Sequence, residues 1–230
     1  MKSKISYVIL KYDAKADAIF TKSSNNSKHA YKMPTFEYDQ TINSVYDDVK
    51  KAVHENLFKL DTFVDENHIF LPFVNVIPNK QSCNYVAVVF ETTKDYFSSM
   101  NYESWSQVKY DHIHHAWDLS WDNGLSDPAD YMLEDAISSE YVANPKDEDE
   151  INFSNVMHFI DEKTREFPIL GLMAGDEFTM GEVFHYQDLL GIEALKAGNN
   201  ATFENQYSDS IQAIKDNRLT TSYKIKKEYL

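Results

Sequence analysis

The sequence predicts an α+β fold, in which segments rich in strands precede segments rich in helices. The first half of the chain reads in the order strand, strand, helix, strand, strand. The last 80 residues read as helices followed by strands. With 230 residues, of which 43% are hydrophobic, the chain is long enough to bury a sizeable core.

Four strands are predicted in the first half, because short runs of β-branched and aromatic residues alternate there with polar turns. These strands cover residues 4–13, 17–24, 68–78 and 84–92. The turn 14–17 joins the first pair, and a polar segment at 79–82 joins the second pair. With one helix between the two pairs, this order predicts an α+β sandwich-like arrangement rather than a doubly wound sheet.

The helix between the two pairs covers residues 44–58. Its apolar residues fall on one helical face, with Ser44 placed to cap the N-terminus. That face carries Val45, Val49, Ala52 and Val53. The helix is therefore expected to pack one side against the core and to leave its charged side accessible.

The second half is predicted to be mainly helical. Thr179 and Glu182 have the spacing of a capping box, and Gly191 is placed to end the same helix. The predicted helices cover residues 110–122, 128–142, 152–167, 179–191 and 200–214. Residues 218–230 then read as one or two strands, and three helices followed by a β-ribbon are typical of a winged helix-turn-helix.

Charge divides the chain into three parts. The formal net charge is −15, but residues 118–150 alone hold 11 acidic residues and one lysine, a net charge of −10. Residues 1–117 are nearly neutral, and the final 20 residues are basic. We therefore predict an N-terminal domain over residues 1–117, an acidic linker or insertion over residues 118–150, and a C-terminal domain over residues 151–230.

A cytoplasmic protein is expected from the cysteine content and the hydropathy. Cys83 is the only cysteine, which suits a reducing compartment. The first 20 residues lack the pattern of a leader peptide, and the strongest apolar run, residues 85–90, is too short to span a bilayer.

Helix 44–58 can be aligned with a family motif. In the Nudix motif, G-x5-E-x7-R-E-U-x-E-E-x-G-U with U a bulky aliphatic residue, glutamates on one helix face hold Mg²⁺ or Mn²⁺ against a diphosphate. "YKMPTF", residues 31–36, resembles the aromatic-x-aliphatic-Pro-Gly-Gly segment before the family helix. In this register Lys50 and Lys51 take the Arg-Glu positions, and His54 and Glu55 take those of the glutamate pair.

Later segments resemble the Nudix-related transcriptional regulators of NAD metabolism, the NrtR-type proteins. "YDHIHHA" (110–116) is similar to the Asp-His segment that closes their Nudix domain, and "ILGLMAGDEFTMGEVFHYQDLLG" (169–191) resembles the start of their helix-turn-helix. "NNATFENQY" (199–207) lies where that family has Asn-Phe-Arg-Arg. The resemblance implies a Nudix-like α/β/α sandwich with a mixed sheet, followed by a winged helix-turn-helix domain. It also implies a homodimer that binds DNA and senses an ADP-ribose-like nucleotide diphosphate.

The candidate ligand-binding residues are Lys51, His54 and Glu55, where an ammonium group and an imidazole replace family carboxylates. The same residues also fit an ordinary exposed helix face. A divergent hydrolase of the ADP-ribose pyrophosphatase type is the alternative function. Its catalytic residue would be Glu55, acting with Mg²⁺ or Mn²⁺ and with other acids such as Glu37, Asp47 or Asp48. A protein–protein module that has lost both activities is a third possibility.

A group of Asp and His residues at positions 111–115 permits two interpretations. On a helix, Asp111 and His115 would share one face and could hold a transition metal. For Asp111, His112, His114 and His115, a structural Asp-His pair at the domain junction with extra histidines on the surface is the simpler interpretation, and we assign no metal site.

The candidate DNA-binding residues lie in the last 31 positions. Helix 200–214 contains no Lys or Arg. Base recognition is therefore assigned to its amide side chains, since Asn and Gln can pair with adenine. Phosphate contacts are assigned to the basic C-terminal segment. The full set is Asn200, Asn205, Gln206, Lys215, Arg218, Lys224, Lys226 and Lys227.

Overall fold

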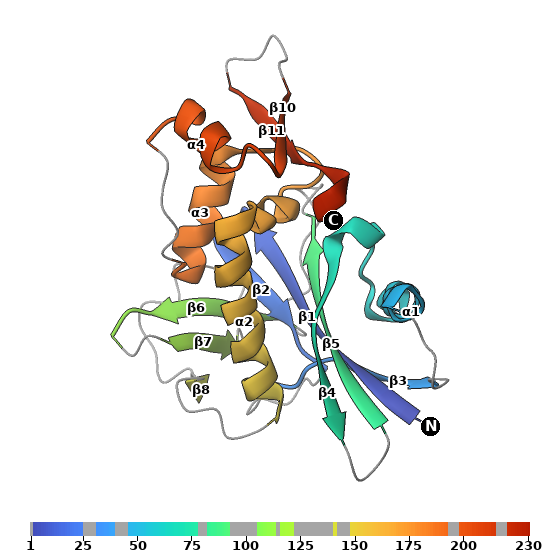
Figure 1. The fold of residues 1–230 in the computed structure, drawn as a ribbon. Coiled ribbons are helices and arrows are strands. Elements are labelled where there is room, and N and C mark those ends of the chain that lie inside the picture. The colour runs from blue at the N-terminus through green and yellow to red at the C-terminus, as the bar shows by residue number, and fades with distance from the viewer. Residues whose placement is uncertain are drawn as a thin grey trace.

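A mixed central sheet with a helix against each face forms the core of the protein, and a smaller sheet lies near the C-terminal helices (Figure 1). The structure, a computed structural model, describes residues 2–24, 31–39, 46–77, 82–92, 105–113, 116–121, 140–141, 148–192, 198–214 and 220–230. The predicted α+β class and mixed sheet are confirmed.

The central sheet has the strand order β4-β5-β1-β2-β6-β7-β8 in the described residues. Strand β3 lies off this path and pairs with the first half of β1, whereas β2 pairs with its last residues. Strands β1 and β5 are parallel, and the other pairs are antiparallel. The strands are β1 (Lys2–Asp13), β2 (Ala18–Lys22), β3 (Thr35–Asp39), β4 (Ile69–Ile77), β5 (Ser82–Glu91), β6 (Trp105–Asp111), β7 (Ala116–Trp121) and β8 (Glu140–Tyr141).

Strand β1 supplies side chains to both faces of the sheet because successive residues point in opposite directions. Ile5, Tyr7 and Ile9 belong to one hydrophobic cluster, and Val8 and Leu10 belong to the other. A strand buried on both faces reads as a nearly continuous apolar run, as "ISYVIL" does.

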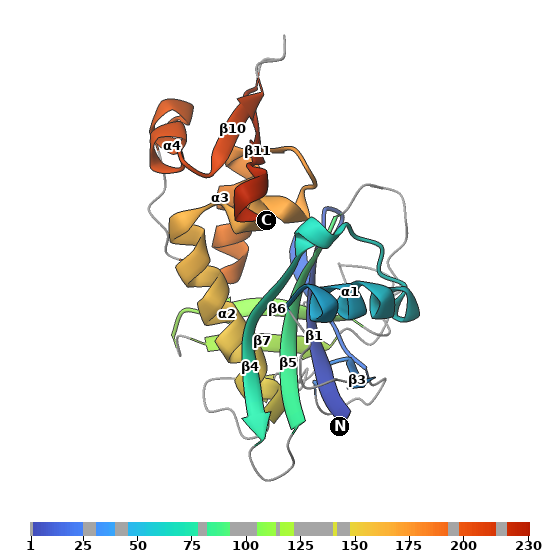
Figure 2. The same ribbon diagram turned by 45° about the vertical axis from the view of Figure 1, so that its right-hand side comes forward.

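One helix covers each of these clusters (Figure 2). Helix α1 (Tyr46–Leu57) buries Val49, Val53 and Leu57 against the face that carries Ile5 and Tyr7. Helix α2 (Glu148–Glu166) buries Phe153, Val156, Met157 and Ile160 against the opposite face. The order helix, sheet, helix is the layered arrangement expected from the Nudix resemblance.

The C-terminal elements continue the cluster beneath α2. They are the 3₁₀ segment η6 (Ile169–Met173), β9 (Phe178–Thr179), α3 (Met180–Leu190), α4 (Asn200–Gln206), β10 (Ile211–Ile214) and β11 (Ser222–Ile225). The three strands form an antiparallel sheet in the order β10-β11-β9. Phe178, Phe203 and Tyr223 are buried in the same cluster as Val8 of the central sheet. The described part of the chain therefore has a hydrophobic core that runs from the central sheet into the C-terminal elements.

Most predicted elements are confirmed within a few residues. The four predicted strands correspond to β1, β2, β4 and β5, and the helices at 44–58, 152–167 and 179–191 correspond to α1, α2 and α3. The capping box of Thr179 and Glu182 is present, and Gly191 ends α3 with φ +64°. Ser44 and Val45 lie outside the described residues.

The predicted helix at 110–122 is wrong. The described residues form the end of β6, a turn at 112–113 and strand β7. Trp117 and Leu119 are both buried, as residues two positions apart on one face of a strand are. The helical face proposed for Asp111 and His115 is therefore wrong too, and His114 and His115 lie outside the described residues.

Three further predictions need correction. Strand β3, within "TFEYD", was not predicted. The predicted helix 200–214 ends at Gln206, and Ile211–Ile214 form β10 instead. The last residues of the predicted acidic linker, 148–150, form the first turn of α2, where carboxylates favour the positive end of the helix dipole.

The acidic region lies mostly outside the described residues. Of the predicted helix 128–142, only the two-residue strand β8 is described. The predicted domain boundaries within 118–150 stay a prediction.

Candidate ligand-binding site

Helix α1 orients the three predicted ligand-binding residues. Because Val49, Val53 and Leu57 bury one side of the helix, Lys51 and Glu55 are exposed on the opposite side. His54 is half-buried at the edge of the helix. The structure therefore brings the three residues onto adjacent turns, with only His54 directed toward the rest of the protein.

His54 is fixed by the segment that follows the helix. Its Nε2 atom lies 2.9 Å from the carbonyl oxygen of Val64, and its ring meets Phe58 edge-on with centroids 5.9 Å apart. A carbonyl oxygen only accepts hydrogen bonds, so Nε2 carries the proton. The imidazole therefore holds residues 58–64 against the end of α1.

A pocket of about 340 Å³ opens beside His54. We call it the His68 pocket, after a buried histidine in its wall that is 3% exposed. Its described lining comes from α1, from the segment between α1 and β4, from the end of β5, and from the segment between η6 and β9. The lining residues are His54, Phe58, Thr62, Phe63, Val64, Asp65, His68, Thr92 and Asp176.

His68 connects this pocket to the C-terminal elements. Its Nδ1 atom lies 3.0 Å from the carbonyl oxygen of Phe90, and its Nε2 atom lies 3.7 Å from Oδ1 of Asp176. The Asp176 side chain is 72% exposed and lies two residues before β9. Neither residue was predicted from the sequence, because a histidine before a strand and an aspartate in a loop do not form a recognisable motif.

A second polar group, which the sequence analysis also missed, lies on the same face of the sheet as α1. The Lys11 ammonium lies 2.8 Å from the Glu91 carboxylate, and Lys22 donates to the carbonyl oxygen of Leu60. Both ammonium groups lie over the Trp105 ring, at 5.8 and 5.3 Å from its centroid. Burial lowers the pKa of Lys22, whereas Glu91 and Asp61 raise it. These contacts fix the segment after α1 to the sheet.

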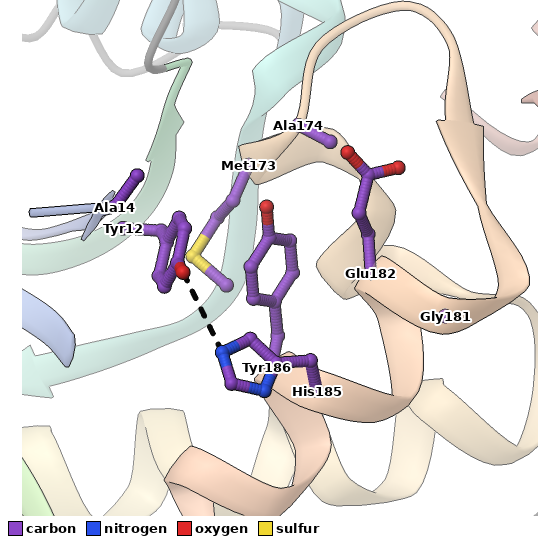
Figure 3. Close-up of a pocket in the computed structure, with 8 residues that line it drawn as sticks. All are labelled: Tyr12, Ala14, Met173, Ala174, Gly181, Glu182, His185 and Tyr186. Carbon is purple, nitrogen blue, oxygen red and sulfur yellow. Dashed lines mark hydrogen bonds between the residues drawn. The ribbon is translucent and has the colours of Figure 1, made fainter. Parts of the chain in front are cut away.

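A second pocket, of about 300 Å³, lies between β1, η6 and α3 (Figure 3). Tyr12 of β1 faces His185 and Tyr186 of α3 across it. Asp17, in the β1–β2 turn, accepts hydrogen bonds from Tyr12 at 2.8 Å and from His185 at 2.6 Å. The hydrogen bonds from Tyr12 and His185 lower the pKa of Asp17.

The C-terminal end of α3 is also attached to the central sheet. The indole N–H of Trp117 in β7 donates to the carbonyl oxygen of Leu190 at 2.9 Å. Gly191, the next residue, lies so close to Tyr110 of β6 that an added Cβ atom would overlap the ring. Helix α3 is therefore held on the sheet at two points, at His185 near its middle and at its C-terminus.

Some of the predicted DNA-binding residues are exposed, whereas others make contacts within the protein. Asn205 is exposed and Gln206 is half-buried on α4, whereas Asn200 lies 3.4 Å from the Thr221 hydroxyl. Lys224 and Lys227 are exposed. Lys226 donates to the carbonyl oxygens of Ser208 and Asp209, so its ammonium closes the turn after α4. Lys215 and Arg218 lie outside the described residues.

The described residues contain no group of three or more His, Cys, Asp or Glu side chains arranged to hold a metal ion. Glu37, Asp47, Asp48 and Glu55, the acids considered for a hydrolase, are all exposed. Nor does any helix in the described part of the chain have both the length and the apolar character needed to cross a membrane.

The arrangement of sheet and helices was compared with known proteins. A scan against protein-family models and a search of curated proteins found no match. Among solved structures, a MutT/nudix family protein from Enterococcus faecalis is similar with 12% identity and a TM-score of 0.64, over 98% of this chain and 88% of that chain. Shewanella oneidensis NrtR is similar with 14% identity and a TM-score of 0.52, over 98% and 94% of the two chains.

A second structure of Shewanella oneidensis NrtR, complexed with a 27mer DNA, is similar with 13% identity and a TM-score of 0.51, over 97% of this chain and 93% of that chain. At these identities the similarity concerns the fold. The fold is that of the Nudix-related, NrtR-type proteins that the sequence resembles.

Proposed function

We propose that this protein is a ligand-responsive transcriptional regulator. In this proposal the N-terminal Nudix-like part binds an ADP-ribose-like nucleotide diphosphate near Lys51, His54 and Glu55. The C-terminal elements form a winged helix that binds DNA, and the protein acts as a homodimer because readers of two half-sites are usually two-fold symmetric.

The observation that carries the proposal is the composition of the His68 pocket. Its wall combines His54 of α1 with Asp176, which lies three residues before Thr179, the N-cap of α3. A ligand in this pocket would contact both the Nudix-like helix and the segment that leads into the C-terminal elements. Differential contact of this kind is what a ligand needs to bias one conformation over another.

The C-terminal elements support the DNA-binding half. Their order is helix, strand, helix, helix, strand, strand, and the three strands pair into one small antiparallel sheet. Helix α4 begins at an Asn199 cap and presents Asn205 on its surface, and β11 presents Lys224. One similar NrtR structure contains DNA, which is a property of that protein and supports testing the same activity here.

The attachment of α3 to the sheet indicates how a ligand would act. Trp117, Asp17 and Tyr110 all hold α3 against the β-strands. A hinge between the central sheet and α3 within one protomer would break these contacts. We therefore propose that the ligand shifts the dimer between two relative arrangements of its protomers, one of which it binds better.

DNA binding and ligand binding can be tested separately. Gel-shift titrations against the DNA upstream of the protein's own gene should show binding that weakens with salt along a log–log line. ADP-ribose should raise the melting temperature, since a ligand that binds only the folded state stabilises it. If ADP-ribose and other nucleotide diphosphates leave the melting temperature unchanged, the sensing half of the proposal is wrong.

The hydrolase alternative has a separate test. Release of phosphate-containing products from ADP-ribose should be measured with Mg²⁺ and with Mn²⁺, for the wild-type protein and for Glu55→Gln. We expect no metal-dependent turnover in either protein, because Glu55 is exposed and the described residues offer no cluster of carboxylates around it. Turnover that requires Mn²⁺ and is abolished in Glu55→Gln would establish the hydrolase instead.

A further inference from the structure

The hydrogen-bonding pattern of the His68 pocket restricts the kind of chemical group that can occupy it. The Nδ1 atom of His68 faces the Phe90 carbonyl oxygen, an obligatory acceptor, at 3.0 Å, so Nδ1 carries a proton. In the neutral imidazole, Nε2 is then an acceptor. It faces the Asp176 carboxylate, also an acceptor, at 3.7 Å. While the imidazole is neutral, two acceptors therefore face each other in the pocket wall.

A hydrogen-bond donor that lies beside these two groups, within hydrogen-bond distance of each, would satisfy both. His54 does not supply it, because its Nε2 proton is directed to the Val64 carbonyl oxygen. A proton on Nε2 of His68 would serve, and so would an N–H group of a bound molecule. His68 is 3% exposed, so the position of its ring is fixed by packing and by Phe90 before any ligand arrives.

The rest of the lining indicates a flat ligand without negative charge. Phe58 and Phe63 are 56% and 67% exposed, and their rings meet edge-on with centroids 5.6 Å apart. Exposed aromatic faces at a pocket are suited to stacking with a planar ring. The lining also includes Asp65 and, in the part of the chain that the structure describes, no Lys or Arg. Because the described lining places the carboxylates of Asp65 and Asp176 in the pocket without a Lys or Arg beside them, it would repel a phosphate group.

We propose that the His68 pocket binds a planar heteroaromatic group that carries an exocyclic N–H donor, placed beside Nε2 of His68 and the carboxylate of Asp176 and within hydrogen-bond distance of both. The amino group of an adenine ring and the carboxamide of a nicotinamide ring share this chemistry. The anionic part of the ligand remains outside the pocket, on the side of α1 where Lys51 lies one turn from His54. This inference rests on the proposed function and assigns the ligand's orientation.

The test uses the full chain and calorimetric titration with four small molecules. Adenosine is compared with purine riboside, which lacks the amino group, and nicotinamide is compared with pyridine, which lacks the carboxamide. In the pair that supplies the natural group, removal of the donor should weaken binding roughly 10- to 100-fold, the effect of losing a hydrogen bond to a charged acceptor. The pair that shows the difference identifies which of the two groups binds.

Asp176→Asn should weaken binding of the same molecule by at least roughly 10-fold, because it removes the charged acceptor. Asp176 is largely exposed, so this variant is expected to fold normally. Glu177→Gln is the matched control: it removes the neighbouring exposed carboxylate, which does not line the pocket. Its affinity should equal that of the wild type.

ADP-ribose, titrated in parallel, separates this inference from the proposed function. If ADP-ribose binds but neither pair differs and Asp176→Asn behaves like Glu177→Gln, the assignment of the pocket is wrong and the regulator proposal stands. If adenosine or nicotinamide binds through Asp176 but ADP-ribose does not, the pocket assignment stands and the nucleotide-diphosphate proposal is wrong. If none of the five molecules binds, both are wrong.

Discussion

The indole N–H of Trp117 and the carbonyl oxygen of Leu190 are joined by a buried 2.9 Å hydrogen bond, which connects β7 of the central sheet to the last residue of α3. The last carbonyls of a helix have no partner within it, so this bond satisfies a group that would otherwise be buried and unpaired. The two residues are 73 positions apart, and through them the end of α3 is fixed to the central sheet.

Trp117→Phe should test this connection. The variant keeps an aromatic ring but leaves the Leu190 carbonyl without its donor, and we expect the free energy of unfolding to fall by about 1–3 kcal/mol. Chemical denaturation measures the change. Hydrogen exchange should also show that amides of α3 lose protection while amides of α1, on the other face of the sheet, do not. Equal loss in both helices would contradict a local role for this bond.

Gly191→Ala should be more damaging than its size suggests. Gly191 has φ +64°, a conformation that disfavours a Cβ atom, and the added atom would overlap the ring of Tyr110. Strain and overpacking together should lower the free energy of unfolding by about 2–4 kcal/mol.

Gly198→Ala is the control, since a Cβ atom there would meet nothing within 4 Å. Thermal denaturation of both variants should show a much lower melting temperature for Gly191→Ala alone. A similar melting temperature in the two variants would show that α3 can move away from Tyr110 at little cost.

The hydrogen bonds that Asp17 accepts from Tyr12 and His185 should make the free energy of unfolding depend on pH in the acidic range. The pKa of Asp17 is lowered in the folded protein, so its contribution is fully present above its ordinary value of 3.8 and is lost as the pH falls through the folded-state value. The wild type should therefore be more stable than Asp17→Asn above about pH 5, and the difference should shrink below about pH 4.

Urea denaturation of the two proteins between about pH 5.5 and 2.5 measures this difference. Asparagine is suitable because Asp17 has φ 49°, a left-handed conformation that asparagine tolerates. Because the Asp17 side chain is 63% exposed, solvent screening keeps the effect small. A difference that stays constant down to the lowest pH would mean that the charge of Asp17 contributes nothing.

Lys224 and Lys226 should separate DNA contact from folding. Lys224 is exposed, so Lys224→Gln should weaken DNA binding, lower the slope of the log–log salt dependence by about one, and leave the melting temperature unchanged. Lys226→Gln should lower the melting temperature, because it removes the donor to the Ser208 and Asp209 carbonyls. An unchanged salt slope in Lys224→Gln would exclude a phosphate contact at that position.

Local signals in the sequence predicted the fold well where they were strong. Thr179, Glu182 and Gly191 defined α3 correctly because capping and C-terminal glycine act within a few residues. The valine face of α1 was also correct at Val49 and Val53. The short alternation around Trp117 and Leu119 was misread as helical, since six residues of strand carry a weaker periodic signal than a long helix.

The candidate site was harder to predict because its parts are far apart in the sequence. His54 was predicted from the Nudix register and does line a pocket. His68 and Asp176 are 108 positions apart and meet only because η6 packs against the end of β5, which no local pattern indicates. Lys11, Lys22 and Trp105 likewise meet only through strand pairing.

In the proposed function, a nucleotide diphosphate and DNA bind the same protein, and each changes the affinity for the other. The most direct measurement is a fluorescence-anisotropy titration of labelled upstream DNA with the full chain, in the absence and presence of saturating ADP-ribose at one fixed salt concentration. We expect ADP-ribose to change the Kd for DNA by roughly 5- to 150-fold, and bound DNA to change the Kd for ADP-ribose by the same factor. Tight binding of both ligands with identical Kd values under the two conditions would contradict it.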